Sequence, residues 1–183
     1  MYFPKLNILK TNRLMNDYLI NTFDGWLASQ SEMYTDYLNP LEFVAECRVN
    51  KKLALSIFSL ASSIKYFESH GESQDEKNPL LKVKYILDCP YCNENINTYF
   101  SRNDIPQDSI CCKEDMCYSF LPADHPEKIN IFFELLDDPI LSVDDELSIY
   151  EKKPSPPLTV ADEDSDLLEA MWQNEERKGT LSE

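Results

Sequence analysis

The stretch from Asp88 to Cys117, DCPYCNENINTYFSRNDIPQDSICCKEDMC, holds five of the six cysteines of this 183-residue chain. Cys89-Pro-Tyr-Cys92 is a CxxC turn directly after a predicted strand, and Cys112 and Cys117 form a second pair with four residues between them. Two cysteine pairs on two tight turns can place four thiolates tetrahedrally around a zinc ion. We therefore predict a structural zinc site with Cys89, Cys92, Cys112 and Cys117 as ligands.

Cys111 and Cys112 compete for the third ligand position, because neighbouring residues on a strand face opposite ways. We favour Cys112, since its shorter gap to Cys117 keeps both ligands in one turn, and Cys111 then packs as a small apolar residue. A thiol redox site is the alternative use of a CxxC turn. The helix that follows a redox CxxC is replaced here by NENINTYF, which is typical of turn and strand.

Composition bounds the compartment and the chemistry. The N-terminus has no apolar stretch of signal-peptide length and the chain has no apolar run long enough to span a membrane. We expect a cytoplasmic protein without a membrane segment, in which thiols stay reduced and bind metal. With three glycines, two histidines and no phosphate-loop motif, the chain offers little support for a nucleotide site or a nucleophile–base pair. Four thiolates also leave zinc no open position for water, so we do not expect an enzyme.

The first half of the chain shows a regular order of elements. Apolar spacing predicts an amphipathic helix over 9–29, Asn39-Pro40 starts a short helix, and a third helix covers 51–63. A strand at 64–68, a polar loop at 69–79 and an alternating strand at 80–88 follow. This order resembles a winged helix, and the resemblance implies either a protein-binding module or a DNA-binding one.

Cations near the third helix and on the predicted wing are the candidates for DNA contact. They are Arg48, Lys51, Lys52, Lys82 and Lys84. Acidic neighbours balance most of them, and affinity for DNA depends on neutralising phosphates, so nucleic acid is the disfavoured partner.

The acidity is concentrated at the C-terminal end: residues 1–88 have a net charge of −1, whereas residues 137–183 have −10. EKKPSPPLTVADEDSD (151–166) predicts a disordered or extended linker. A short helix follows, and it either folds back onto the body or docks in a partner's groove. We favour docking in a partner, through the apolar residues Leu167, Leu168, Met171 and Trp172.

The spacing CPxC…CxxxxC with flanking strands resembles a zinc ribbon, although a ribbon more often has CxxC at its second turn. A winged-helix pattern that runs into LDCPYC is similar to bacterial regulatory and adaptor proteins, including modules of signalling enzymes and accessory subunits of anti-phage defence systems. The predicted fold is α+β, with a winged-helix-like domain (1–88), a small β zinc ribbon (89–136) and an acidic, partly disordered tail (137–183).

The resemblance implies a non-catalytic adaptor or regulatory subunit. Its expected partner is a larger enzyme or effector encoded in the same operon, bound through the winged-helix-like domain and the tail. The alternative is a DNA-binding transcriptional regulator or antitoxin, and a thiol oxidoreductase is the weaker third hypothesis.

Overall fold

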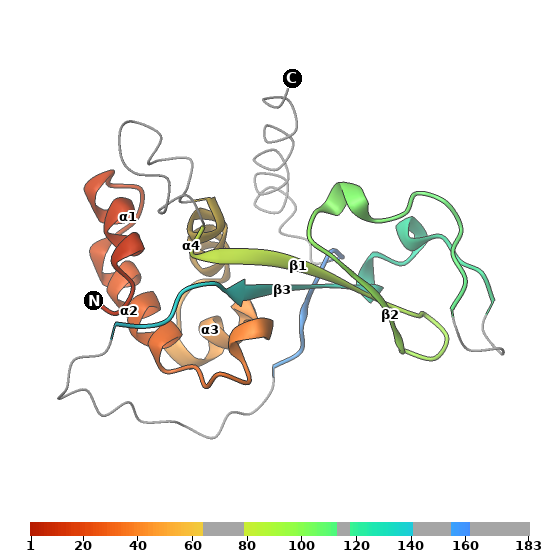
Figure 1. Cartoon of the computed structure of the whole chain (residues 1–183), viewed down its shortest axis with the longest axis horizontal. Helices are drawn as coiled ribbons and strands as arrows, with labels where there is room; N and C mark the ends of the chain where they lie inside the picture. Colours follow the sequence, from red (N-terminus) through yellow and green to blue (C-terminus); the bar gives the residue numbers. More distant parts are fainter. Residues whose placement is uncertain (64–78, 113–117, 141–154, 162–183) are drawn as a thin grey trace. The chain divides into compact units, whose positions relative to one another are not determined.

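The computed structural model describes residues 1–63, 79–112, 118–140 and 155–161, and their fold is α+β (Figure 1). The helices of this part of the chain are α1 (Asn7–Thr11), α2 (Asp17–Ala28), α3 (Pro40–Cys47) and α4 (Lys51–Ser63). Its strands are β1 (Leu81–Asp88), β2 (Asn95–Tyr99), β3 (Ile129–Leu135) and β4 (Leu158–Thr159). The described residues form two compact units: unit 1 combines those within 1–82 with those within 133–156, and unit 2 combines those within 83–132 with residues 157–161.

The helix predicted over 9–29 is two helices in the structure, so that prediction was wrong in its extent. α1 ends at Thr11, and Asn16 starts α2 by accepting a hydrogen bond from the Tyr18 N–H at 2.7 Å. An asparagine side chain that satisfies a first-turn N–H favours a new helix start over continuation of the old helix. As a result Leu14 and Tyr18 are exposed, whereas Phe23 and the other apolar residues of α2 are buried.

The next two helices along the chain, α3 and α4, lie where the sequence predicts them. The Asn39 side chain accepts from the Leu41 N–H at 3.0 Å, and Pro40 occupies the first helical position of α3. Arg48 ends α3 in the left-handed conformation, with φ 54°. Asn50 then caps α4 by accepting from the Lys52 N–H at 2.8 Å.

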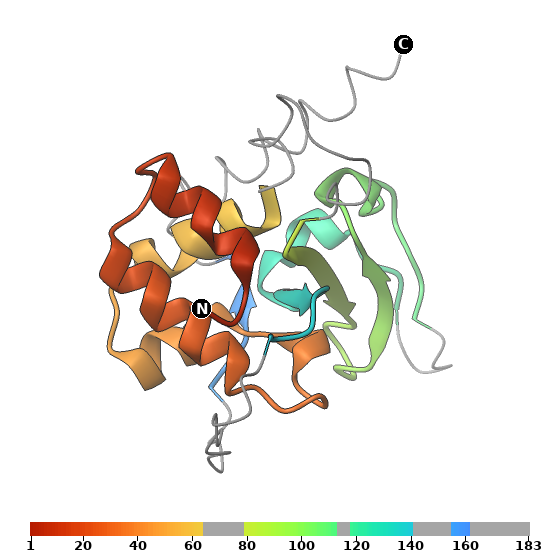
Figure 2. The ribbon, with the colours of Figure 1, turned by 60° about the vertical axis from the view of Figure 1, so that its left-hand side comes forward.

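The core of unit 1 is a cluster of aromatic side chains. Phe23 contacts the rings of Phe43 and Phe58 edge-on, at centroid distances of 5.2 and 4.9 Å. Phe133, from the end of β3, contacts Phe58 at 4.9 Å. Trp26 lies against the same group and donates its indole N–H to Glu46 at 2.6 Å. Edge-to-face packing of this kind stabilises a core beyond the area that it buries, and here it joins α2, α3 and α4 (Figure 2).

Two buried polar side chains fasten distant backbone to the helices of unit 1. The carboxylate of Asp24 accepts from the Tyr2 and Phe3 N–H groups at 2.9 and 2.8 Å, which fixes the start of the chain. The amide of Asn39, besides capping α3, donates to the Pro156 carbonyl at 2.9 Å and approaches that of Ser155 at 3.4 Å. Asn39 is 2% exposed, so it links the predicted linker to the body of unit 1 from a buried position.

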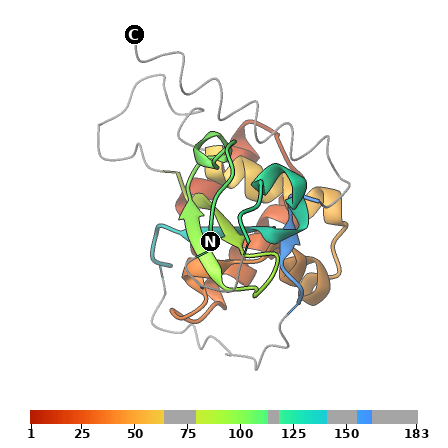
Figure 3. The ribbon, with the colours of Figure 1, turned by 90° about the vertical axis from the view of Figure 1, so that its right-hand side faces the viewer.

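The strands lie in the order β2-β1-β3-β4 (Figures 1 and 3). β2 pairs with β1 and β4 pairs with β3, both in antiparallel register. The Leu136 N–H donates to the Leu80 carbonyl and the Asn130 amide donates to Asp88, so β1 and β3 also run in opposite directions. β1 confirms the predicted alternating strand, but Lys84 is 9% exposed where the alternation predicted a solvent-facing side chain.

β4 revises the interpretation of the linker. Leu158 is fully buried, it pairs with Ile131, and the Val160 N–H donates to the Ile129 carbonyl at 3.0 Å. Within the predicted linker (151–166), Leu158–Thr159 is therefore a strand of the sheet, and a turn follows it at residues 160–161. The strand predicted at 64–68 and nearly all of the polar loop at 69–79 lie outside the described residues.

Candidate metal centre

The first turn of the candidate site follows β1 without a break. The Cys89 N–H donates to the Glu94 carbonyl and the Asn93 N–H donates to the Cys89 carbonyl, both at 2.9 Å. Asn93 has φ 61°, a left-handed conformation that asparagine adopts more readily than most residues. This closed turn directs Cys89, which is buried, and Cys92, which is half-buried, to one place.

The second turn is closed by a pair of residues on its two sides. Ile110 and Phe120 exchange both backbone hydrogen bonds at 2.9 Å as an antiparallel bridge. Cys112 stands two residues beyond Ile110 and is half-buried, while its neighbour Cys111 is exposed. Cys117, the predicted fourth ligand, falls between Cys112 and Phe120 in the sequence but lies outside the described residues.

The sulfur atoms of Cys89, Cys92 and Cys112 all lie within 4.8 Å of one another. The Sγ atoms of Cys92 and Cys112 are 3.7 Å apart. A zinc–sulfur distance of about 2.3 Å gives a tetrahedron whose edges are about 3.8 Å, so this spacing suits two ligands of one ion. It is far longer than the roughly 2.05 Å of a disulfide bond. The structure thus brings together three thiols that can bind a metal ion.

Two side chains, one just before β3 and one at its start, hold the first turn in place. The Lys128 ammonium donates to the Asn93 side chain at 2.7 Å, next to the left-handed backbone of that residue. The Asn130 amide donates to the Asp88 carboxylate at 2.6 Å, one residue before Cys89. Burial raises the pKa of Asp88 above its usual range, while the hydrogen bond from Asn130 and the charge of Lys128 oppose that rise.

The sequence identified the thiols but not these supports. Asn93 had a local signal, because asparagine directly after a CxxC turn suits a left-handed residue. No local sequence signal marked Lys128 or Asn130, because their hydrogen bonds join residues that are 35 and 42 positions apart in the chain.

Aromatic side chains cover this part of unit 2. Tyr91, inside the CxxC turn, contacts the Tyr118 ring at 5.9 Å and the Phe120 ring at 6.4 Å, both edge-on. Phe120 is buried, whereas Tyr91 and Tyr118 are 52% and 76% exposed. The two cysteine turns therefore share an aromatic contact as well as their sulfur cluster, and that contact leaves two tyrosine rings at the surface.

The other predicted binding residues are not gathered into a site that the structure describes. In unit 1, Arg48, Lys52 and Lys82 are exposed and Lys51 is half-buried. In unit 2, Lys84 is buried. The predicted partner-binding residues Leu167, Leu168, Met171 and Trp172 lie outside the described residues.

No protein-family model, curated protein or solved structure matches the chain. Among the described residues, none of the helices has the length and apolar character that crossing a membrane requires.

Proposed function

We propose that this protein is a non-catalytic adaptor or regulatory subunit whose cysteine cluster holds a structural zinc ion. The observation that carries the proposal is the sulfur geometry, in which three thiols from two separate turns converge within 4.8 Å. Tetrahedral sites made only of sulfur are typical of zinc or iron, and zinc is the ion that small structural sites of this kind use. Cys117 supplies the fourth thiolate in this proposal.

The zinc ion would act as a cross-link between the two turns. Unit 2 is small, and a structural zinc site contributes its binding energy to folding. A zinc ion with four thiolate ligands keeps no position for a water molecule or a substrate, so the ion would stabilise and not catalyse. On this proposal residues 89–136 are a zinc ribbon, and function resides on the protein's surfaces.

Binding of a protein partner follows from the composition of those surfaces. The exposed rings of Tyr91 and Tyr118 have the amphipathic character of residues enriched at protein interfaces. The acidic C-terminal segment would speed association with a basic partner. Unit 1, with its winged-helix-like order of helices, supplies the second surface in this proposal.

Metal analysis of the purified protein tests the zinc assignment. We expect a single zinc ion per chain, and after exchange for cobalt we expect the visible bands of tetrahedral thiolate coordination. Serine substitution of Cys89, Cys92, Cys112 or Cys117 should abolish stoichiometric binding. Cys111→Ser and Cys47→Ser are the matched controls and should keep it. Unchanged zinc content in the Cys89→Ser/Cys92→Ser variant would refute the assignment and favour the thiol-redox hypothesis.

Co-purification with the products of neighbouring genes tests the adaptor function. The full chain should co-elute with one of them, and a chain that ends at Ala161 should bind more weakly. The cut follows Ala161 so that the chain keeps β4 with the buried Leu158 and the hydrogen bond from the Val160 N–H to the Ile129 carbonyl. Failure of the full chain to co-elute with any neighbour would contradict the adaptor function without affecting the zinc assignment.

DNA binding is the second candidate function, and the exposure of Arg48 and Lys52 beside the start of α4 favours it. Retardation of the protein's own promoter fragment, weakened by salt and lost in Lys51→Ala/Lys52→Ala, would support it. Buried Lys84 is the poorest of the predicted phosphate contacts, and its substitution should leave any such binding unchanged unless unit 2 unfolds.

A further inference from the structure

Two tyrosine rings form an exposed corner in unit 2, beside the candidate metal centre. The Tyr91 and Tyr118 rings are 5.9 Å apart between centroids and meet at 75°, and both are exposed. Buried Phe120 contacts the Tyr91 ring at 6.4 Å, so the corner has an apolar base. The proposed zinc ion needs neither ring as a ligand, and the corner is therefore available for a second role.

The geometry of this corner suits a cation. The face of an aromatic ring attracts a cation that lies within about 6 Å of the ring centroid. Because the rings of Tyr91 and Tyr118 stand nearly perpendicular and 5.9 Å apart, a single cation in the corner can lie over both faces within that range. A planar guanidinium stacks on one ring while its edge faces the other, and this favours arginine over lysine.

The described part of unit 2 carries a surplus of negative charge. It has six carboxylate side chains and three basic ones. They are Asp88, Glu94, Asp104, Asp108, Asp124 and Glu127 on one side, and Lys84, Arg102 and Lys128 on the other. Glu94 is exposed and closes the same turn that contains Tyr91, through the hydrogen bond from the Cys89 N–H to the Glu94 carbonyl. A basic ligand is attracted to such a surface, and a phosphate is repelled by it.

Charges of both signs stand close to the base of the corner. Glu127 pairs with His125 at 3.3 Å, and the His125 ring contacts the Phe120 ring edge-on at 5.7 Å. Lys128 donates to the Asn93 side chain at 2.7 Å, and that hydrogen bond holds its ammonium against the CxxC turn. The carboxylates of the region outnumber this ammonium, so the surface still favours a positive ligand.

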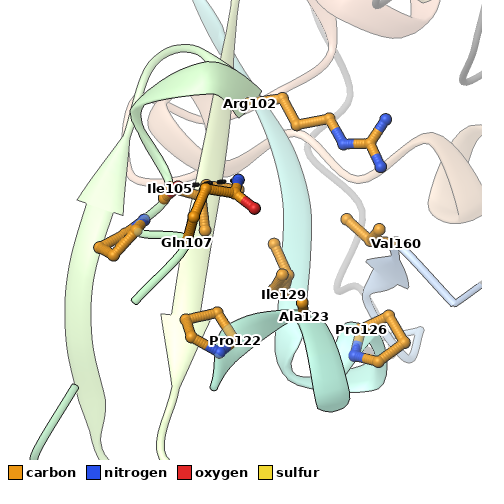
Figure 4. A pocket seen from close by; sticks show the side chains of 9 residues that line it. Arg102, Ile105, Gln107, Pro122, Ala123, Pro126, Ile129 and Val160 are labelled. Atoms are coloured by element: carbon orange, nitrogen blue, oxygen red, sulfur yellow. Dashed lines mark hydrogen bonds between the residues drawn. The ribbon is translucent and has the colours of Figure 1, made fainter. Parts of the chain in front are cut away.

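The pocket of unit 2 is a less suitable place for a cation (Figure 4). It has a volume of about 170 Å³. Its lining residues are Arg102, Ile105, Pro106, Gln107, Pro122, Ala123, Pro126, Ile129 and Val160. The lining contains neither a carboxylate nor an aromatic ring, so it has nothing to stabilise a positive charge. The tyrosine corner is therefore the better site for a basic group.

We propose that the corner between Tyr91 and Tyr118 binds an arginine side chain from a basic segment of the protein partner. The inference rests on the proposed adaptor function and gives its docking surface a chemistry: the guanidinium lies against the two rings, and neighbouring basic residues of the partner face the carboxylates of unit 2. Exposed tyrosines also stack on the bases of single-stranded nucleic acid. Here the phosphates of such a strand would meet the same carboxylates, which disfavours that partner.

Titration of the full chain with a short basic peptide tests the proposal. The probe is a fluorescent alternating Gly-Arg octapeptide with blocked ends, and anisotropy measures its binding at about 0.15 M salt, where distant surface charges are screened. The control peptide has citrulline in place of arginine, which keeps the planar group and removes its charge. We expect the arginine peptide to bind at least about tenfold more tightly than the citrulline peptide. The acidic C-terminal segment is the same in every variant, so ratios between variants report on the corner.

Removing the rings should weaken binding of the arginine peptide. We expect a loss of about threefold for Tyr91→Leu or Tyr118→Leu and about tenfold for the double variant, from the size of cation–π attraction at exposed sites. Phenylalanine at either position keeps a ring face and should preserve the affinity. Tyr18→Leu in unit 1 is the matched control, because Tyr18 is as exposed as Tyr118, and it should leave the affinity unchanged. Circular dichroism shows whether each variant still folds.

A pair of charge variants tests the electrostatic part. Glu94→Gln should weaken binding about twofold, as expected for a surface ion pair. Asp104→Asn should have no effect, because β2 separates residue 104 from the turn that contains Tyr91. Equal losses for the two variants would show that the net charge of the chain, and not the corner, attracts the peptide, and would count against the proposal.

Three other results would overturn the proposal. The first is equal affinity for the arginine and citrulline peptides, and the second is a Tyr91→Leu/Tyr118→Leu variant that binds the arginine peptide as well as Tyr18→Leu does. The third is tighter binding of an oligothymidylate that the double variant abolishes, which would mean that the rings stack on bases. Co-elution with a neighbouring gene product that the double variant leaves unchanged would also overturn the inference while the adaptor function stands.

Discussion

Replacing Asn39 by alanine should cost more stability than replacing an ordinary helix-capping asparagine. Its side-chain oxygen accepts from the Leu41 N–H at 3.0 Å and caps α3, while its amide nitrogen donates to the Pro156 carbonyl at 2.9 Å. Asn50 provides the matched control, because its oxygen accepts from the Lys52 N–H at 2.8 Å and it is exposed. The difference between the two variants therefore isolates the link from Asn39 to the backbone at residues 155–156.

The magnitudes follow from typical values for the two interactions. Loss of an N-cap side chain costs about 1 kcal/mol, which is the expectation for Asn50→Ala. A buried hydrogen bond to a backbone carbonyl adds a net contribution of about 1 kcal/mol. We expect Asn39→Ala to lower the free energy of unfolding by about 2 kcal/mol in total. The contact with Ser155, at 3.4 Å, is too long to add much.

Urea unfolding in a Trp172→Phe background measures the difference. Trp26 is then the one tryptophan left, and its fluorescence reports on unit 1, where it is buried among the aromatic rings. The slope of free energy against urea should match between variants, so that the midpoints compare stabilities directly. Equal losses for Asn39→Ala and Asn50→Ala would refute the inference that Asn39 anchors the segment leading to β4.

Three further substitutions test other parts of the structure. Asp24→Ala removes the acceptor of two backbone N–H groups and should cost about 3 kcal/mol by the same fluorescence assay, whereas exposed Asp17→Ala should cost less than about 1 kcal/mol; similar losses would contradict the clamp on the N-terminus. Arg48→Gly should stabilise unit 1 by up to about 1 kcal/mol, because glycine adopts the left-handed conformation without a Cβ penalty; a loss of stability would show that the arginine side chain matters more than its backbone strain. Asn93→Ala should weaken cobalt binding about fivefold relative to Asn93→Gly, since both lose the contact with Lys128 and only alanine resists a φ of 61°; equal affinities would show that the backbone of this turn is not under strain.

Local sequence signals predicted the elements that depend on neighbours in the chain. Asn39-Pro40 gave the start of α3, and apolar alternation gave β1. The break between α1 and α2 was missed, because the apolar residues continue with helical spacing through it while Asn16 caps a new helix. The capping side chain of Asn16 therefore sets the start of α2, although the helical spacing of apolar residues continues across that point.

The candidate metal centre was predictable as far as its thiols are concerned. The preference for Cys112 over Cys111 agrees with the sulfur cluster, because Cys111 is exposed and Cys112 lies 3.7 Å from Cys92. Cys117 as the fourth ligand stays a prediction. The contacts that position the site join distant parts of the chain, such as Lys128 with Asn93, and no local pattern encodes them.

The path of the chain through β1 and β3 has a thermodynamic consequence. Residues 83–132 are inserted between two parts of unit 1, and the hydrogen bond between Leu80 and Leu136 holds the ends of that insertion together. The entropic free energy of closing a loop of this length is on the order of 3 kcal/mol. Folding of either unit closes the loop, so the other unit then folds without that cost. Each unit therefore lends stability to the other through the shared backbone alone. If the cysteine cluster binds zinc as proposed, removal of the ion should, by this linkage, lower the melting temperature of the helices around Phe23.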